Sequence, residues 1–69
     1  MADNDTNDNT HTIELRLVEA HALALAQFVK RVGWSDFRTN AVNDAEAYEI
    51  RAAVDALQRA LAEAGFAPR

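Results

Sequence analysis

The sequence of 69 residues has no cysteine, one proline and two glycines. The lack of cysteine excludes disulfides and thiolate metal sites, and two glycines are too few for a glycine-rich phosphate loop. No apolar run approaches the roughly 20 residues that span a bilayer. Residues 1–9 are polar and lack the basic start and apolar stretch of a signal peptide. We therefore expect a cytoplasmic protein without a membrane partner.

The sequence also has no excess of basic residues over acidic ones. The formal net charge is −4, and three of the eleven acidic residues lie in the first nine positions, which leaves eight acids against seven Lys and Arg. We expect residues 1–10 to form a disordered acidic tail and residues 11–69 to form a single small helical domain. A domain of this size without disulfides needs very good helix packing or self-association for its stability.

An alternating pattern runs from Thr12 to Leu17. Polar and apolar residues follow each other with a period of two, which is typical of a half-buried strand with Ile13, Leu15 and Leu17 on its apolar face. The sequence has no second strand-like run, so the strand needs a partner outside the chain. We predict pairing with the same strand of another copy, in a homodimer, or with a strand edge of another protein. In the alternative interpretation, these residues are an extended lead-in to a helix.

A helical period replaces the alternation from about Val18. Apolar residues then recur at spacings of three and four, and several alanines add helix propensity. Gly33 is expected to end this long helix in a left-handed conformation, with Trp34 folded back on Val29.

A short helix and a second long helix are predicted to follow. Ser35 is the expected N-cap of the short helix, which runs to Val42. The apolar stripe of the last helix cannot be extended back through this region, so a break is expected at Asn43, which forms a capping box with Glu46. Gly65 is expected to end the last helix. The predicted fold class is mainly α, with one short N-terminal strand paired across a dimer and then a long, a short and a long helix.

Two faces of the last helix are candidates for contacts. One is an apolar seam with heptad spacing, which we favour as the domain's own core over a docking face. Its residues are Ala47, Ile50, Val54, Leu57, Leu61 and Ala64, and Phe66 is expected to fold back on Leu61. The other face is rich in alanine, whose small side chain lets a second backbone approach closely. Its residues are Ala45, Ala52, Ala53, Ala56 and Ala60.

Two aromatic residues complete the candidate protein interface. Trp34 and Tyr48 belong to residue types that are enriched at interface hot spots, although Trp34 is also a candidate for a core contact. The interface that we predict consists of these two aromatics with Ala45, Ala52 and Ala56.

Groups for catalysis are few. His11 and His21 lack a second ligand at the spacing of a helical metal-binding pair. Asp44, Glu46 and Glu49 stand at a helix start, where capping and the helix dipole explain them. We expect no enzymatic activity, no metal and no cofactor.

Three runs of sequence carry a resemblance to known proteins: RVGWSDFR, NDAEAYEIR and LAEAGFAPR. The part of the chain from Ala22 to Arg69 resembles a group of small uncharacterised bacterial proteins whose members often travel on plasmids and integrated elements. The resemblance implies an accessory protein of a mobile element. By analogy with small acidic proteins that such elements encode, it also implies an inhibitor of a host defence complex of the anti-CRISPR or antirestriction type.

A looser resemblance covers residues 12–42, where a strand, a helix and a second helix resemble the ribbon-helix-helix repressors. It implies a dimer whose strand reads the major groove through Thr12, Glu14 and Arg16. It also implies a phosphate anchor at Ser35 and Asp36, beside Arg38 on the second helix. The acid at position 14, the near-neutral domain and the third helix depart from this pattern.

The function that we expect is protein binding without catalysis. The expected partners are a second copy of the chain and an unidentified protein target. The analogy with mobile-element proteins implies that this target is a defence complex of the host. The alternative is a dimeric DNA-binding transcriptional regulator of the ribbon-helix-helix type, with Thr12, Arg16 and Arg38 in contact with DNA.

Overall fold

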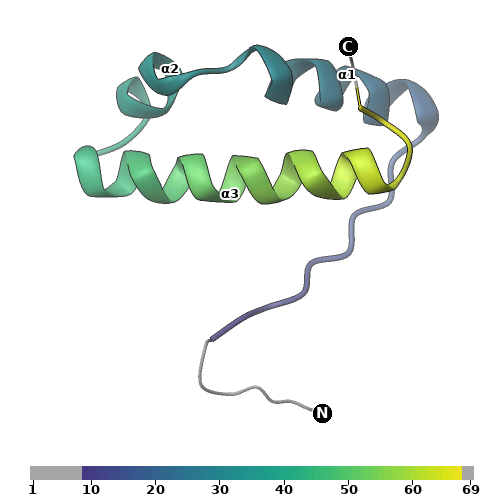
Figure 1. Cartoon of the computed structure of the whole chain (residues 1–69), viewed down its shortest axis with the longest axis horizontal. Helices are drawn as coiled ribbons and strands as arrows, with labels where there is room; N and C mark the ends of the chain where they lie inside the picture. Colours follow the sequence, from purple (N-terminus) through teal and green to yellow (C-terminus); the bar gives the residue numbers. More distant parts are fainter. Residues whose placement is uncertain (1–8, 68–69) are drawn as a thin grey trace.

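The computed structural model describes residues 9–67 and contains three helices. They are α1 at Glu19–Arg31, α2 at Trp34–Thr39 and α3 at Asp44–Glu63. α1 and α3 lie side by side and antiparallel, and α2 fills the turn between them (Figure 1). α3 packs against both of the other helices. The predicted mainly helical fold, with the order long, short, long, is confirmed. None of the helices in the described range is long and apolar enough to cross a membrane.

The chain approaches α1 through residues 9–18, which we call the N-terminal segment. It leaves the helical body as an open trace (Figure 1). The predicted strand from Thr12 to Leu17 forms no strand pairing in the described part of the single chain, which offers no second extended run. A strand ladder needs backbone groups on a neighbouring strand, so a strand here requires another chain. Most of the predicted acidic tail, residues 1–8, lies outside the described residues.

The core lies between the two long helices and is small. Within residues 9–67, the buried side chains are Ala22, Ala26, Val29, Ala47 and Leu61. The cluster of Ala26, Val29 and Leu61 is completed by half-buried residues, which are Leu25, Val54, Leu57 and Phe66. Three of the six seam residues of α3, Val54, Leu57 and Leu61, therefore pack in this cluster against α1, which agrees with the interpretation of the seam as core. Three of the five buried residues are alanines, so little apolar area is removed from water.

The link between α1 and α2 differs from the prediction. The chain leaves α1 in an extended conformation at Val32, and Gly33 has φ −141°, which is not left-handed. Gly33, not Ser35, is the N-cap of α2, and its N–H donates to the Asp36 carboxylate at 2.9 Å. The prediction of a left-handed Gly33 was therefore wrong, and so was the cap at Ser35. Both followed from treating the glycine as the end of one helix when it begins the next.

The end of α2 is also earlier than predicted. The helix stops at Thr39, and the Asn40 side chain donates to the Asp36 carbonyl at 2.9 Å. The same carbonyl also accepts from the Asn40 backbone N–H at 3.2 Å, so the side chain adds a second bond at the C-terminal end of α2.

Both ends of α3 confirm the predicted signals, with one change of partner. The Asn43 side chain accepts from the Glu46 N–H at 2.9 Å, as an N-cap does. The Glu46 carboxylate accepts from the N–H of Val42 at 2.7 Å, one residue before the expected Asn43. At the other end, Gly65 has φ +101° and the Phe66 N–H donates to the Leu61 carbonyl at 2.8 Å, which is a Schellman ending.

Candidate protein-binding surface

An apolar groove lies between the N-terminal segment and the C-terminal half of α3. Its volume is about 710 Å³, and its walls come from the segment, from the start of α1 and from α3. Of the described residues that line it, Glu14 alone carries a charge. A site for a polar small molecule needs several convergent polar groups, which this lining does not supply. The groove is suited to apolar side chains of another polypeptide.

Only part of the alanine-rich face of α3 lines this groove. Ala53, Ala56 and Ala60 line it, with Leu57 and Leu61 beside them. Ala45 and Ala52, which belong to the predicted interface, are exposed and lie outside it. Only Ala56 of the three predicted interface alanines is therefore part of the groove. Which alanines line the groove depends on the path of the N-terminal segment, and helical periodicity carries no signal for that path.

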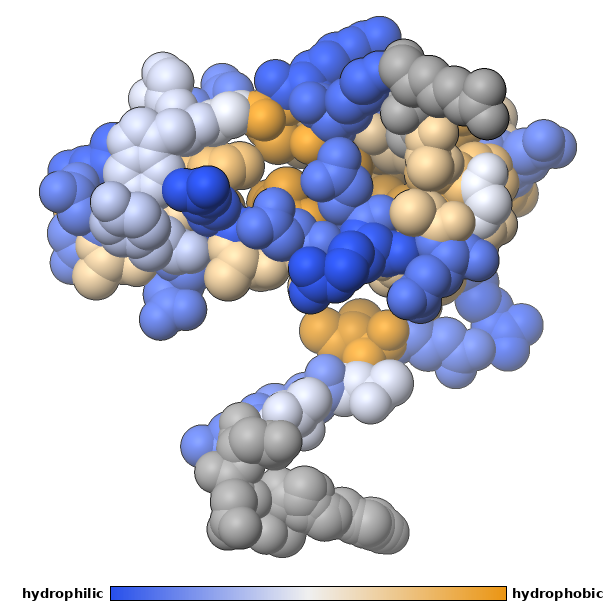
Figure 2. Space-filling model, viewed as in Figure 1, coloured by the Kyte–Doolittle hydropathy of each residue, from blue (hydrophilic) through white to orange (hydrophobic). Residues whose placement is uncertain are grey.

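The N-terminal segment supplies the opposite wall of the groove. Ile13, Leu15 and Leu17 line it and are 87%, 60% and 38% exposed. These are the apolar positions of the predicted strand, and the structure brings all three to one place. Figure 2 shows hydrophobic residues where this segment meets the helical body. Large exposed apolar side chains that lie together are typical of a protein-interaction surface.

The polar positions of the same segment form an ion pair. The Arg16 guanidinium lies 3.5 Å from the Glu14 carboxylate, with both side chains largely exposed. Residues two apart in an extended chain share a face, so this pair lies opposite the apolar positions. An exposed pair of this kind contributes little to stability, and its charges stay available to another chain.

An aromatic pair lies at the other end of the molecule, where α2 begins. The rings of Trp34 and Tyr48 have centroids 4.6 Å apart and planes tilted by 44°. The side chains are 40% and 60% exposed, so the two predicted interface aromatics form one surface feature. Trp34 lies outside the buried cluster around Val29. Phe28, 59% exposed, is a further large apolar side chain on the surface.

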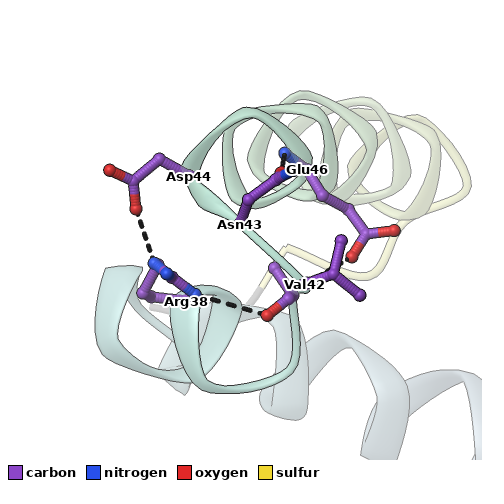
Figure 3. A network of polar contacts seen from close by, with 6 residues as sticks. Arg38, Val42, Asn43, Asp44 and Glu46 are labelled. Atoms are coloured by element: carbon purple, nitrogen blue, oxygen red, sulfur yellow. Dashed lines mark hydrogen bonds and ion pairs between the residues drawn. The ribbon is translucent and has the colours of Figure 1, made fainter.

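The junction of α2 and α3 is held by polar contacts (Figure 3). The Arg38 guanidinium is bonded to the Asp44 carboxylate at 2.5 Å and donates to the Ala41 carbonyl at 3.3 Å. The Asp36 carboxylate accepts from Gly33. Two of the residues that a DNA-binding interpretation assigns to phosphate are thus engaged within the chain, and Arg16 is paired with Glu14.

Acidic and histidine side chains are scattered over the described residues. No group of three or more among residues 9–67 is placed to hold a metal ion. Among these residues, His11 and His21 are both exposed.

The family comparison covers the whole chain. Residues 1–69 match the model of a family described as a family of unknown function, DUF7706. The chain belongs to the DUF7706 family. No curated protein and no solved structure matches it. Membership in DUF7706 agrees with the resemblance to small uncharacterised proteins, and the family description assigns no activity.

Proposed function

We propose that this DUF7706 protein acts without catalysis, as a protein-interaction module. The observation that carries the proposal is the apolar side-chain surface left open in the single chain. The groove of about 710 Å³ at one end of the molecule has an almost uncharged lining. The five buried residues within residues 9–67 form too small a core to account for so many apolar side chains. Contact with other polypeptides would bury this surface and add stability.

The first partner in this proposal is a second copy of the chain. The segment from Thr12 to Leu17 has the alternation of a strand, and the described part of its own chain offers no strand beside it. A homodimer joined through this segment supplies the missing ladder and covers Ile13, Leu15 and Leu17. Self-association also compensates for a small core.

The second partner is a protein of another kind, which the Trp34–Tyr48 pair binds. Half-exposed Trp and Tyr rings in contact with each other offer large apolar area at low entropic cost, as interface hot spots do. The narrower form of this proposal is that the target is a defence complex of the host, inhibited by an accessory protein of a mobile element. It is supported by the resemblance described above.

A quantitative pull-down tests the binding function. The tagged protein is compared with Tyr48→Ala and with the matched control Gln58→Ala, an exposed position on the same helix. We expect the wild type and the control to retain one host protein in near-equimolar amount and Tyr48→Ala to lose it. Equal retention by all three proteins, or no protein in stoichiometric amount, would overturn this assignment.

DNA binding is the competing function, because a dimeric ribbon would present Thr12 and Arg16 on its outer face. The geometry favours protein binding, since Arg38 is bonded to Asp44 and the acidic Glu14 lies beside Arg16, where it would repel phosphate. Phosphate affinity depends on basic surface charge. A shift of duplex DNA that declines steeply with salt and is lost on Arg16→Ala would replace the present proposal.

A further inference from the structure

We infer that the second copy pairs with the first in one defined register: the two segments run antiparallel, with Leu15 opposite Leu15 of the second copy. This inference rests on the homodimer of the proposed function and adds the geometry of its interface. Three features of residues 12–17 determine it: their free backbone groups, their apolar face and the order of their charges.

The backbone of the segment is available for pairing. Within the described part of the chain, the N–H and C=O groups of residues 12–17 form no hydrogen bond. An extended run with open backbone groups is a template for a second strand. The neighbouring strand would lie about 4.8 Å away, in the plane of the ladder.

The apolar face of the segment and the groove determine on which side of the ladder the apolar side chains of the second strand lie. A strand paired in phase places its own Ile13, Leu15 and Leu17 on the same face as those of the first copy. That face is the one that lines the groove. Ala53, Ala56 and Ala60 on the opposite wall leave room for the additional leucine and isoleucine side chains. The second copy therefore fills the groove of the first with its own Ile13, Leu15 and Leu17 side chains.

The charge order on the outer face selects the register. With Leu15 opposite Leu15, Glu14 lies opposite Arg16 of the second copy, and by symmetry the same pair forms again. The apolar face then pairs Ile13 with Leu17 of the second copy. Opposite charges across a ladder stabilise it, and like charges destabilise it.

The neighbouring antiparallel registers are disfavoured by the same residues. Centring the pairing on position 14 sets Glu14 opposite Glu14, and centring it on position 16 sets Arg16 opposite Arg16. A slip by a single residue turns the apolar face of one strand to the outside. In-register parallel pairing places Glu14 beside Glu14 and Arg16 beside Arg16 of the second copy. The register centred on Leu15 is the one that satisfies both faces.

Single-cysteine variants test the register, because the chain contains no cysteine of its own. Residues directly opposite in an antiparallel ladder have Cα atoms about 4.5–5.5 Å apart, which suits a disulfide. Under mild oxidation we expect Leu15→Cys to cross-link to a covalent dimer, while Glu14→Cys and Arg16→Cys alone do so much more slowly. A mixture of the Glu14→Cys and Arg16→Cys chains should cross-link readily, and this mixture leaves the apolar face intact.

The outcomes separate this inference from the proposal on which it rests. Light scattering that shows only monomers would overturn the homodimer together with the register. A dimer in which Glu14→Cys or Arg16→Cys alone cross-links as fast as Leu15→Cys would overturn the register and leave the homodimer standing. Equal cross-linking at positions 14, 15 and 16 would indicate parallel pairing and would also overturn it.

A charge exchange gives an independent readout without cysteine. Glu14→Arg should weaken the dimer on the order of tenfold, since two attractive pairs become two repulsive ones. Arg16→Glu should do the same, and the double variant with both changes should restore the wild-type dissociation constant. A double variant as weak as either single change would contradict the pairing of Glu14 with Arg16.

Discussion

Asn43 sets the start of the longest helix with one side-chain oxygen, which accepts from the Glu46 N–H. Asn43→Ala removes this acceptor and leaves the amide without an internal partner. We expect a loss of about 1 kcal/mol in the free energy of unfolding, seen as a melting temperature lower by roughly 4–8 °C in circular dichroism. Asn43→Asp keeps an acceptor at the same place and should melt close to the wild type. An equal loss in both variants would show that the cap is not the cause.

The two glycines offer a matched comparison at the residue scale. Gly65 has φ +101°, and Gly33 has φ −141°; a Cβ on either would meet no atom within 4 Å. Space is therefore equal, and only the backbone conformation differs. We expect Gly65→Ala to lose at least about 1 kcal/mol more stability than Gly33→Ala in urea unfolding. Similar losses in the two variants would contradict a left-handed ending of α3.

Local signals explain which caps could be predicted from the sequence. Asn43 with Glu46, and Gly65 with Phe66, act within one turn of the helix that they end, so a few neighbouring residues determine them. Gly33 was misassigned because the choice of helix that it serves depends on tertiary packing. Trp34 enters the first turn of α2, where its ring packs at a tilt against Tyr48 of α3.

At the scale of helices, the pair of α1 and α3 depends on one buried leucine. Leu61 is 7% exposed and lies in the cluster with Val29, whereas Leu23 on α1 is 50% exposed. Leu61→Ala should cost about 2–5 kcal/mol, which is a large share of the stability of a domain this small. Leu23→Ala should cost less than half as much in the same denaturant titration. Equal losses of unfolding free energy in the two variants would contradict a core that contains Leu61 and not Leu23.

The groove face of α3 gives a second prediction at this scale. Ala56 lines the groove, and Ala62, six residues on at about 100° per residue, faces away from it. Ala56→Glu would place a charge in an apolar interface, so we expect it to dissociate the homodimer in sedimentation experiments. Ala62→Glu, with the same change of side chain on the same helix, should remain dimeric. Dissociation of both variants would indicate a general effect of charge.

Periodicity explains how much of this element could be predicted. The heptad spacing of α3 correctly identified the face that packs on α1, because that face follows from the sequence of one helix. The division of the alanine face could not be predicted, since it depends on where the N-terminal segment runs. When a strand pairs with another chain, the sequence of a single chain contains no second strand that would indicate the pairing.

For the molecule as a whole, the balance between core and open surface is the central feature. The described residues include five buried side chains and leave Ile13, Leu15 and Phe28 largely exposed. This open apolar surface is the reason for proposing that the chain associates with other polypeptides. The homodimer, and the partner at the Trp34–Tyr48 pair, are the two associations that we propose for this surface.

The most direct test is the molar mass in solution, measured by light scattering coupled to size-exclusion chromatography at micromolar concentration. The account predicts twice the 7.6 kDa mass of one chain for the wild type. It also predicts a shift toward the monomer mass for Leu15→Glu, which places a charge on the apolar face of the N-terminal segment. A wild-type protein that elutes as a folded monomer across the micromolar range would contradict it.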